Sequence, residues 1–202
     1  MKKDSLIYTV IFSFVITFVF VFILAVAYKG TSERVQKYQK ISEAKAYLSA
    51  SGIKLNPDED PEAKFSKIFG DDFENKEVLI AKINSENIFL SKFSGKGLWG
   101  TISGVIAVNS RIDKIIGIEI TSHSETPGLG GRIEEAWFLN QFRGEKVPDN
   151  IQIVMGTGRG DTISDNGLID GITGATRTSE SVENIINNKL LQLRDLKRRG
   201  EI

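Results

Sequence analysis

The feature that most constrains this chain is an uncharged run near its start, from Leu6 to Ala27. The run reads LIYTVIFSFVITFVFVFILAVA and is rich in phenylalanine, valine and isoleucine. As a helix, its 22 residues would measure roughly 33 Å, enough to cross a hydrocarbon core of about 30 Å. The run therefore predicts a single membrane-spanning helix inside an N-terminal tail and anchor of residues 1–28.

A cleaved signal peptide is the alternative, because Ala25, Val26 and Ala27 resemble an A-x-A cleavage site. The apolar region of a signal peptide usually has only about 7–15 residues, so the length of this run favours a retained anchor. Orientation stays open at this point. Basic residues are more numerous after the span than before it, which favours a cytoplasmic C-terminal side. A large domain, however, is translocated with little regard to charge.

Composition excludes several classes of function. The 26 basic and 26 acidic residues cancel, which gives no argument for binding nucleic acid. With no cysteine, the chain has no disulfide, no thiol nucleophile and no cysteine-ligated iron–sulfur cluster. The one histidine, His123, does not supply a metal site. We expect no metal ligands and no catalytic side chains, so redox chemistry here would need a cofactor.

The rest of the chain predicts a helical stalk followed by one α+β domain. Apolar residues recur at helical spacing in residues 29–52, the stalk, and the domain covers residues 53–202. Residues 56–65 form an acidic turn that leads into a short helix. The spacing of the acidic residues in this turn does not fit a calcium-binding loop, so we interpret the turn as a solvated linker. Strands are predicted in residues 77–84, 87–93, 101–109, 114–124 and 150–156, and helices in residues 133–142 and 179–198.

Three segments are rich in glycine: GKGLWG (residues 95–100), ETPGLGG (residues 125–131) and GTGRGD (residues 156–161). Turns explain GTGRGD well. They explain ETPGLGG and GKGLWG less well, and these two segments suggest close approach of the backbone to a large group. None fits a P-loop or a Rossmann fingerprint. Trp99 and Leu129, held between glycines, could grip an aromatic ring system, although packing into the domain's own core explains them equally well.

The stretch DGITGATRTSESV, residues 170–182, carries the most specific signal. Capping of the last helix by Thr178 or Ser179 explains only the second half of this stretch. The first half fits D-x-x-[ST]-G-A-[ST], and with ETPGLGG and GKGLWG upstream the chain resembles the covalent FMN-binding domain family. That family includes the G subunit of the Rnf complex and the C subunit of the Na⁺-translocating NADH:quinone reductase.

The resemblance implies that Thr176 carries FMN through a phosphoester, installed by a flavin transferase. The other cofactor-binding residues that it implies are Asp170, Thr173, Gly174, Ala175, Thr178, Leu98, Trp99, Glu125, Thr126, Leu129 and Gly130. Arg177 follows the attachment site, where we expect an apolar or aromatic residue instead.

The resemblance also implies a function and a location. We expect an electron-carrier subunit of an Rnf-type, ion-translocating oxidoreductase complex, coupled to Na⁺ or H⁺ translocation. The partners would be membrane lipid and other membrane subunits of the complex. The chain would cross the cytoplasmic membrane once, with its N-terminus inside and its FMN domain on the periplasmic or extracellular side. The alternatives are the C subunit of the NADH:quinone reductase, another membrane reductase, and a cofactor-free anchored binding module.

Overall fold

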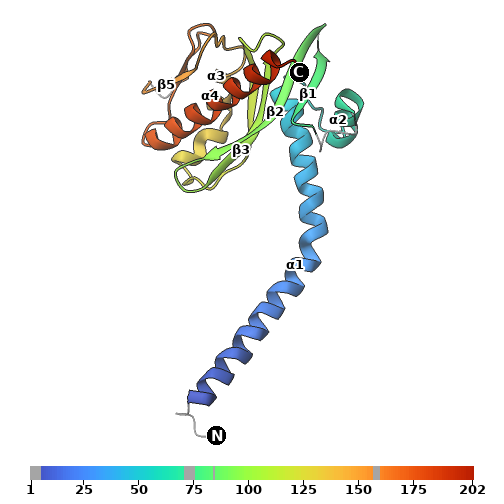
Figure 1. Ribbon diagram of the computed structural model, residues 1–202, viewed down its shortest axis with the longest axis vertical. Coiled ribbons are helices and arrows are strands. Elements are labelled where there is room, and N and C mark those ends of the chain that lie inside the picture. The colour runs from blue at the N-terminus through green and yellow to red at the C-terminus, as the bar shows by residue number, and fades with distance from the viewer. Residues whose placement is uncertain (1–5, 71–75, 84, 157–159) are drawn as a thin grey trace. The chain divides into compact units, whose positions relative to one another are not determined.

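The computed structural model describes residues 6–70, 76–83, 85–156 and 160–202, so the basic residues before the uncharged run and residues 157–159 of GTGRGD lie outside the described residues. The chain divides into two compact units, Met1–Ile41 and Ser42–Ile202. The second unit is an α+β domain with an antiparallel sheet, which confirms the expected fold class (Figure 1).

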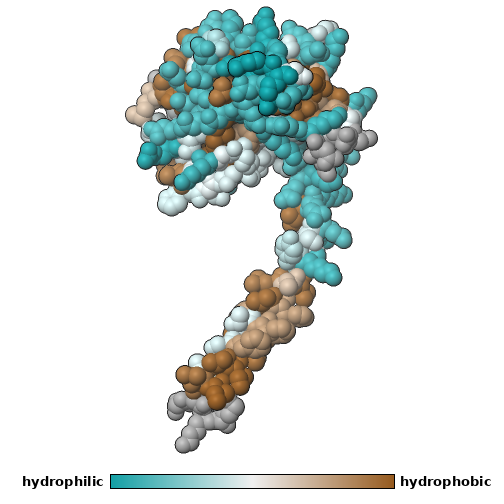
Figure 2. Space-filling view, viewed as in Figure 1, coloured by the Kyte–Doolittle hydropathy of each residue, from teal (hydrophilic) through white to brown (hydrophobic). Residues whose placement is uncertain are grey.

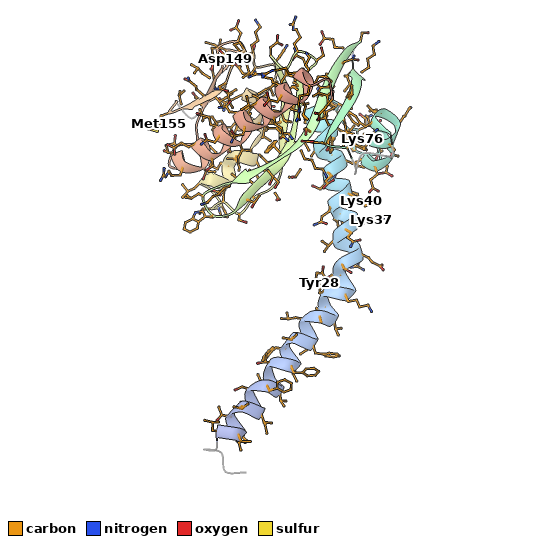
Figure 3. The ribbon with its side chains drawn as sticks, in the orientation of Figure 1. Tyr28, Lys37, Lys40, Lys76, Asp149 and Met155 are labelled. Atoms are coloured by element: carbon orange, nitrogen blue, oxygen red, sulfur yellow. The ribbon has the colours of Figure 1, made fainter. Side chains whose placement is uncertain are left out.

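The described part of the first unit is one apolar helix that becomes polar along its length. It belongs to α1 (Leu6–Ala50), which is long and apolar enough to cross a membrane. Figure 2 shows apolar side chains gathered on the N-terminal part of α1 and polar ones on the part that follows. Tyr28 comes just after the uncharged run, and Lys37 and Lys40 lie farther along the helix (Figure 3). No residue of the apolar window of α1 is buried, so these side chains lack an apolar environment without lipid.

The sheet of the second unit has four antiparallel strands in the order of the sequence. They are β1 (Val78–Ile83), β2 (Glu86–Lys96), β3 (Thr101–Asn109) and β4 (Ile115–Ser122). The expected hairpin joins β3 to β4. Its turn is closed by Asn109, whose side-chain oxygen accepts the backbone N–H of Asp113 at 3.1 Å. All four predicted strands of the meander are therefore confirmed.

Alternating side chains of the sheet build two separate cores. Phe89, Phe93 and Ile106 pack beneath α3 (Ala136–Gln141) and α4 (Thr176–Arg198). Neighbouring residues of β2 and β3 face the opposite way and pack with the end of α1 and with α2 (Pro61–Phe69). These opposite-facing residues are Ile88, Leu90, Val105 and Ala107. The domain therefore has three layers, with the sheet between two layers of helices (Figure 1).

The last turns of α1 are part of this domain. Ala46, Tyr47 and Leu48 are buried in the second core. Ser49 Oγ donates to Glu119 Oε2 on β4 at 2.7 Å. The stalk expected to end at residue 52 thus contributes its final residues to the unit that begins at Ser42.

A short parallel pair completes the domain beside α4. It consists of β5 (Gln152–Val154) and β6 (Leu168–Asp170), and β6 was not predicted. Glu183 Oε2 of α4 accepts the backbone N–H of Ile153 at 2.6 Å. Asn187 Oδ1 accepts that of Ile151 at 2.9 Å. Side chains of α4 therefore hold this pair in place.

Two helix predictions were wrong in their limits. The helix expected over residues 133–142 is a 3-10 helix, η1 (Gly130–Glu134), followed by α3. Glu135 separates them with an extended backbone, and its carboxylate accepts hydrogen bonds from Arg132 and Trp137. The last helix begins at Thr176 and not at Ser179, with Ala175 as its N-cap. Tertiary hydrogen bonds occupy the hydroxyl groups that were expected to cap it.

Glu145 gives the domain a predicted pH dependence. Its side chain is 1% exposed, and Oε1 accepts the backbone N–H of Gly167 at 2.6 Å. Burial raises the pKa of Glu145 above its ordinary value of 4.5; the hydrogen bond from Gly167 opposes this rise, and the charge of Asp161 adds to it. The folded state therefore holds this proton more tightly than the unfolded state does. The stability that this group contributes is present below pH 4.5 and is lost as the pH rises through the folded-state pKa.

We therefore expect Glu145→Gln to remove this loss. Urea unfolding of the detergent-solubilised protein, measured from acidic to neutral pH, should show the free energy of unfolding of the wild type falling relative to that of the variant. The exposed Glu134→Gln serves as the control and should follow the wild type. Parallel pH profiles for wild type and Glu145→Gln would contradict the prediction.

Candidate functional site

The candidate attachment residue, Thr176, lies at the first position of α4 and is exposed. Its N-cap is Ala175, whose side chain cannot accept a hydrogen bond from the first turn of the helix. The backbone N–H groups of that turn therefore have no side-chain cap, and the helix dipole places partial positive charge there. The hydroxyl of Thr176 is 3.9 Å from the sulfur of Met155.

The turn before Thr176 is fixed at both ends. Asp170, at the end of β6, donates its backbone N–H to Gln141 Oε1 at 2.7 Å. Ser179 Oγ accepts the backbone N–H of Ile172 at 3.1 Å. Gly174 has a φ of +80°, a conformation that glycine adopts without strain. The hydroxyl of Thr176 is thus presented by a rigid turn and not by a loose loop.

A cavity of about 350 Å³ opens beside this turn. Its volume lies within the range of about 300–1,000 Å³ that is usual for ligand pockets. Apolar side chains and threonine hydroxyls share its wall, and Met155 projects at the end of β5 (Figure 3). The residues that line it are Ile153, Val154, Met155, Gly156, Gly171, Ile172, Thr173, Thr176, Ser179 and Glu180.

Glu125 connects three segments of the chain, one of which is the first turn of α4. The residue is 4% exposed. Its Oε1 accepts the backbone N–H groups of Leu98 and Trp99 at 2.9 and 3.1 Å. Its Oε2 accepts the hydroxyl of Thr178, in the first turn of α4, at 2.6 Å. One buried carboxylate therefore joins the GKGLWG turn, the ETPGLGG loop and α4.

Glycines make room for this carboxylate. A Cβ atom at Gly97 would lie 2.5 Å from Glu125 Oε1, closer than real Cβ contacts allow. A Cβ atom at Gly130 would lie 2.5 Å from Thr178 Oγ1 and 2.9 Å from Glu125 Oε2. At these two positions the glycines serve close packing around Glu125.

Large apolar side chains project from the two loops that Glu125 joins. Leu98, Trp99 and Leu129 are 51, 70 and 46% exposed. Leu129 lies beside the Thr176 turn, since its Cδ2 is 3.4 Å from the position of a Cβ at Gly174. Packing into the domain's own core, the alternative interpretation, therefore does not describe these side chains.

The structure sorts the expected cofactor residues into two groups. Thr173 and Thr176 line the cavity, with Gly174 and Ala175 between them. Leu98, Trp99 and Leu129 are exposed on the neighbouring loops and do not line that cavity in the described part of the chain.

Four of the expected residues make contacts within the protein. Thr178 is 1% exposed, and its hydroxyl donates to the carboxylate of Glu125, which is buried as well. Thr126 acts through its backbone oxygen, which accepts the N–H groups of Leu129 and Gly131. Asp170 lies against Gly156, where a Cβ atom would meet its carboxylate.

Sequence reasoning missed Met155 and Glu180 as cavity residues. For Met155, the available signal was the segment NIQIVMG. Its apolar residues Val154 and Met155, at and just after the end of the short strand, are both exposed in the structure. Glu180 also pairs with Arg177 at 3.5 Å, which gives Arg177 a surface role next to the attachment residue.

Comparison with known proteins identifies the domain. Residues 97–191, from the GKGLWG turn into α4, match the profile of the FMN-binding domain family. FMN, the expected cofactor, is thereby confirmed.

Named relatives are C subunits of one enzyme, the Na(+)-translocating NADH-quinone reductase. The chain is 37% identical over 98 residues to the C subunit of this enzyme from Yersinia pestis, covering 46% of this chain and 36% of that protein. It is 31% identical over 131 residues to the C subunit from Chlamydia muridarum, covering 56% and 41%. The chain thus spans less than half the length of these relatives. Their names favour the expected C-subunit alternative over the Rnf G subunit.

Two solved structures share the fold. The chain is similar to the crystal structure of the C subunit of Na(+)-translocating NADH-quinone reductase from Parabacteroides distasonis, with a TM-score of 0.63 and 24% identity over 78% of this chain and 92% of that one. Shewanella oneidensis NqrC gives a TM-score of 0.60 and 20% identity, covering 75% and 91%. The fold of this chain therefore recurs in experimentally determined proteins.

The tight packing around Glu125 predicts the effect of adding one methyl group. We expect Gly130→Ala to lower stability by about 1–3 kcal/mol, because the new Cβ atom overlaps Thr178 Oγ1 and Glu125 Oε2. Thermal unfolding of the flavin-free protein measures this. Ser122→Ala, at the exposed end of β4, is the control. An unchanged melting temperature for Gly130→Ala would show that the loop and α4 are not packed as described.

Proposed function

We propose that this protein is a membrane-anchored flavoprotein subunit that carries FMN in a phosphoester bond to Thr176. The observation that supports this most directly is the position of the Thr176 hydroxyl. It is exposed at the uncapped N-terminus of a 23-residue helix and opens onto a cavity of about 350 Å³.

The charge of the phosphodiester suits this position. The first turn of α4 offers backbone N–H groups and the positive end of the helix dipole, which together favour an anion. Thr173, on the wall of the cavity, can donate a further hydrogen bond. The negative charge of Glu180 disfavours an anion at this position, and its ion pair with Arg177 offsets part of that charge.

Attachment would be a transfer from FAD by a flavin transferase. The Oγ–phosphorus bond of Thr176 would form as the pyrophosphate bond of FAD breaks. The hydroxyl proton would pass to the transferase or to water, and AMP, which contains the second phosphate of the pyrophosphate, would be the leaving group. The exposed side chain of Thr176 gives a transferase access, and Gly174 and Ala175 add little bulk beside it.

The apolar side chains of the cavity and of the neighbouring loops suit a flat ring system. Ile153 and Met155 line the cavity, and Leu98, Trp99 and Leu129 are exposed on the two loops that Glu125 joins. Bound FMN supplies one- and two-electron transfer, and the chain supplies attachment, orientation and apolar surroundings. No side chain of the chain has to act as an acid or a base.

The wider role that we propose is electron relay within an ion-translocating NADH:quinone reductase. The names of the relatives support this setting. The apolar helix α1 supports a single-pass anchor in the cytoplasmic membrane. We propose that the N-terminus lies inside and the FMN domain outside, next to other membrane subunits of the complex.

The attachment is tested by substitution of Thr176. Valine has nearly the shape of threonine and lacks the hydroxyl, so Thr176→Val should abolish covalent flavin. Intact mass and peptide mapping of the protein from transferase-competent cells should show the mass of FMN less one water on the wild-type peptide only.

Matched variants make this test specific. Thr176→Ser keeps a hydroxyl and should retain flavin, at least in part. Thr162→Val changes another exposed threonine and should be fully loaded. Covalent flavin on Thr176→Val would refute the assignment of the attachment residue.

The setting is tested by purification of the complex. The tagged protein, drawn from its native membranes in mild detergent, should bring other membrane subunits and a Na⁺-stimulated NADH:quinone reductase activity. The Thr176→Val variant should bring the same subunits with that activity lost. Recovery of an Rnf-type assembly would contradict the quinone reductase setting and leave the attachment site untouched.

A further inference from the structure

Glu125 is a buried acidic residue whose carboxylate is hydrogen-bonded to the first turn of α4, the helix that begins at the proposed attachment residue. It accepts a hydrogen bond from Thr178, two residues after Thr176 on α4. It also accepts the backbone N–H groups of Leu98 and Trp99, in a turn that is closed by the bond from Gly97 N to Gly100 O at 2.8 Å. All three partners donate, which matches the acceptor-only character of an ionised carboxylate.

We infer that Glu125 is the positioning residue of the flavin site, an inference that rests on the proposed attachment of FMN. Its carboxylate sets the distance between the turn that carries Leu98 and Trp99 and the start of α4. Its fixed negative charge opposes the addition of negative charge to the bound flavin.

The geometric half of the inference follows from what the carboxylate connects. Trp99 is 70% exposed, so few side-chain contacts fix its turn, and the two N–H bonds to Glu125 take that role. Residues 125 and 178 are 53 positions apart in the chain, and their bond joins the loop to the helix that carries Thr176. A Cβ atom at Gly97 or Gly130 would overlap the atoms that make these contacts.

The electrostatic half follows from burial. A charge that is 4% exposed is screened far less than one at the surface, so it acts over several ångströms. Glu125 is bonded to Thr178, two residues after the proposed attachment residue, so reduction of FMN held at Thr176 would add negative charge near this carboxylate. Removal of the Glu125 charge should therefore make reduction easier and shift the midpoint potential of the flavin in the positive direction.

Two substitutions separate the positioning role of Glu125 from its electrostatic role. Glu125→Gln keeps an oxygen that can accept from Leu98 and Trp99, and its amide can donate to the hydroxyl of Thr178, so the geometry is retained and the charge is lost. Glu125→Ala loses both. Glu134→Gln removes an acidic side chain that is 66% exposed, from the neighbouring η1, and is the matched charge control.

The first measurement is hydrogen exchange in the flavin-free, full-length protein in detergent, resolved to the peptide that contains residues 97–100. We expect about tenfold faster exchange there in Glu125→Ala, because two backbone N–H groups lose their acceptor. Glu125→Gln and Glu134→Gln should resemble the wild type. Equal exchange in wild type and Glu125→Ala would overturn the positioning role, as would a loss of protection in Glu125→Gln equal to that in Glu125→Ala.

The second measurement is a redox titration of the flavinylated proteins, followed by flavin absorbance. We expect a positive shift of the midpoint potential in Glu125→Gln and none in Glu134→Gln. Equal potentials in Glu125→Gln and wild type would overturn the electrostatic role. A wild type without flavin on Thr176 would refute the proposed function instead, and hydrogen exchange would still decide whether Glu125 holds the turn.

Discussion

The packing of α4 against the sheet is the interaction on which the rest of the domain depends. Val182, Ile186, Leu190 and Leu193 form one face of the helix and are fully or almost fully buried in the larger core. Burial of each such side chain stabilises the fold by roughly 1.5–3 kcal/mol. Because this packing fixes the position of α4 on the sheet, it also fixes the place in the domain at which the first turn of the helix lies. The position of the proposed attachment site is therefore a consequence of the core.

The small hydroxyl residues before and within α4 have different tasks, although they are close in sequence. Thr176 is exposed, and no tertiary hydrogen bond to protein oxygen or nitrogen is found for its hydroxyl within the described residues. Thr178 is buried against Glu125, and Ser179 accepts the N–H of Ile172. One reactive hydroxyl thus lies between structural ones that hold its turn. A capping role alone would not need this arrangement.

Local patterns explain how much could be predicted from the sequence. Strands β1 to β4 and helix α4 repeat apolar residues at periods that a short window reveals, and the uncharged run needs no partner to be recognised. The missed features depend on distant residues. The hydroxyl of Thr178 donates to Glu125, 53 positions away in the chain, and therefore does not cap the helix. Strand β6 has three residues and exists because β5 lies beside it. The break at Glu135 arises from its bonds to Arg132 and Trp137.

The burial of the last turns of α1 has a consequence for anyone who shortens this chain. Residues 44–50 cover the face of the sheet that carries Leu90, Val105 and Ala107. A fragment cut after residue 50 would expose these side chains to water, and an uncovered apolar sheet face promotes aggregation. A soluble fragment that removes the apolar run has to keep residues 42–50, although by sequence they look like part of the stalk.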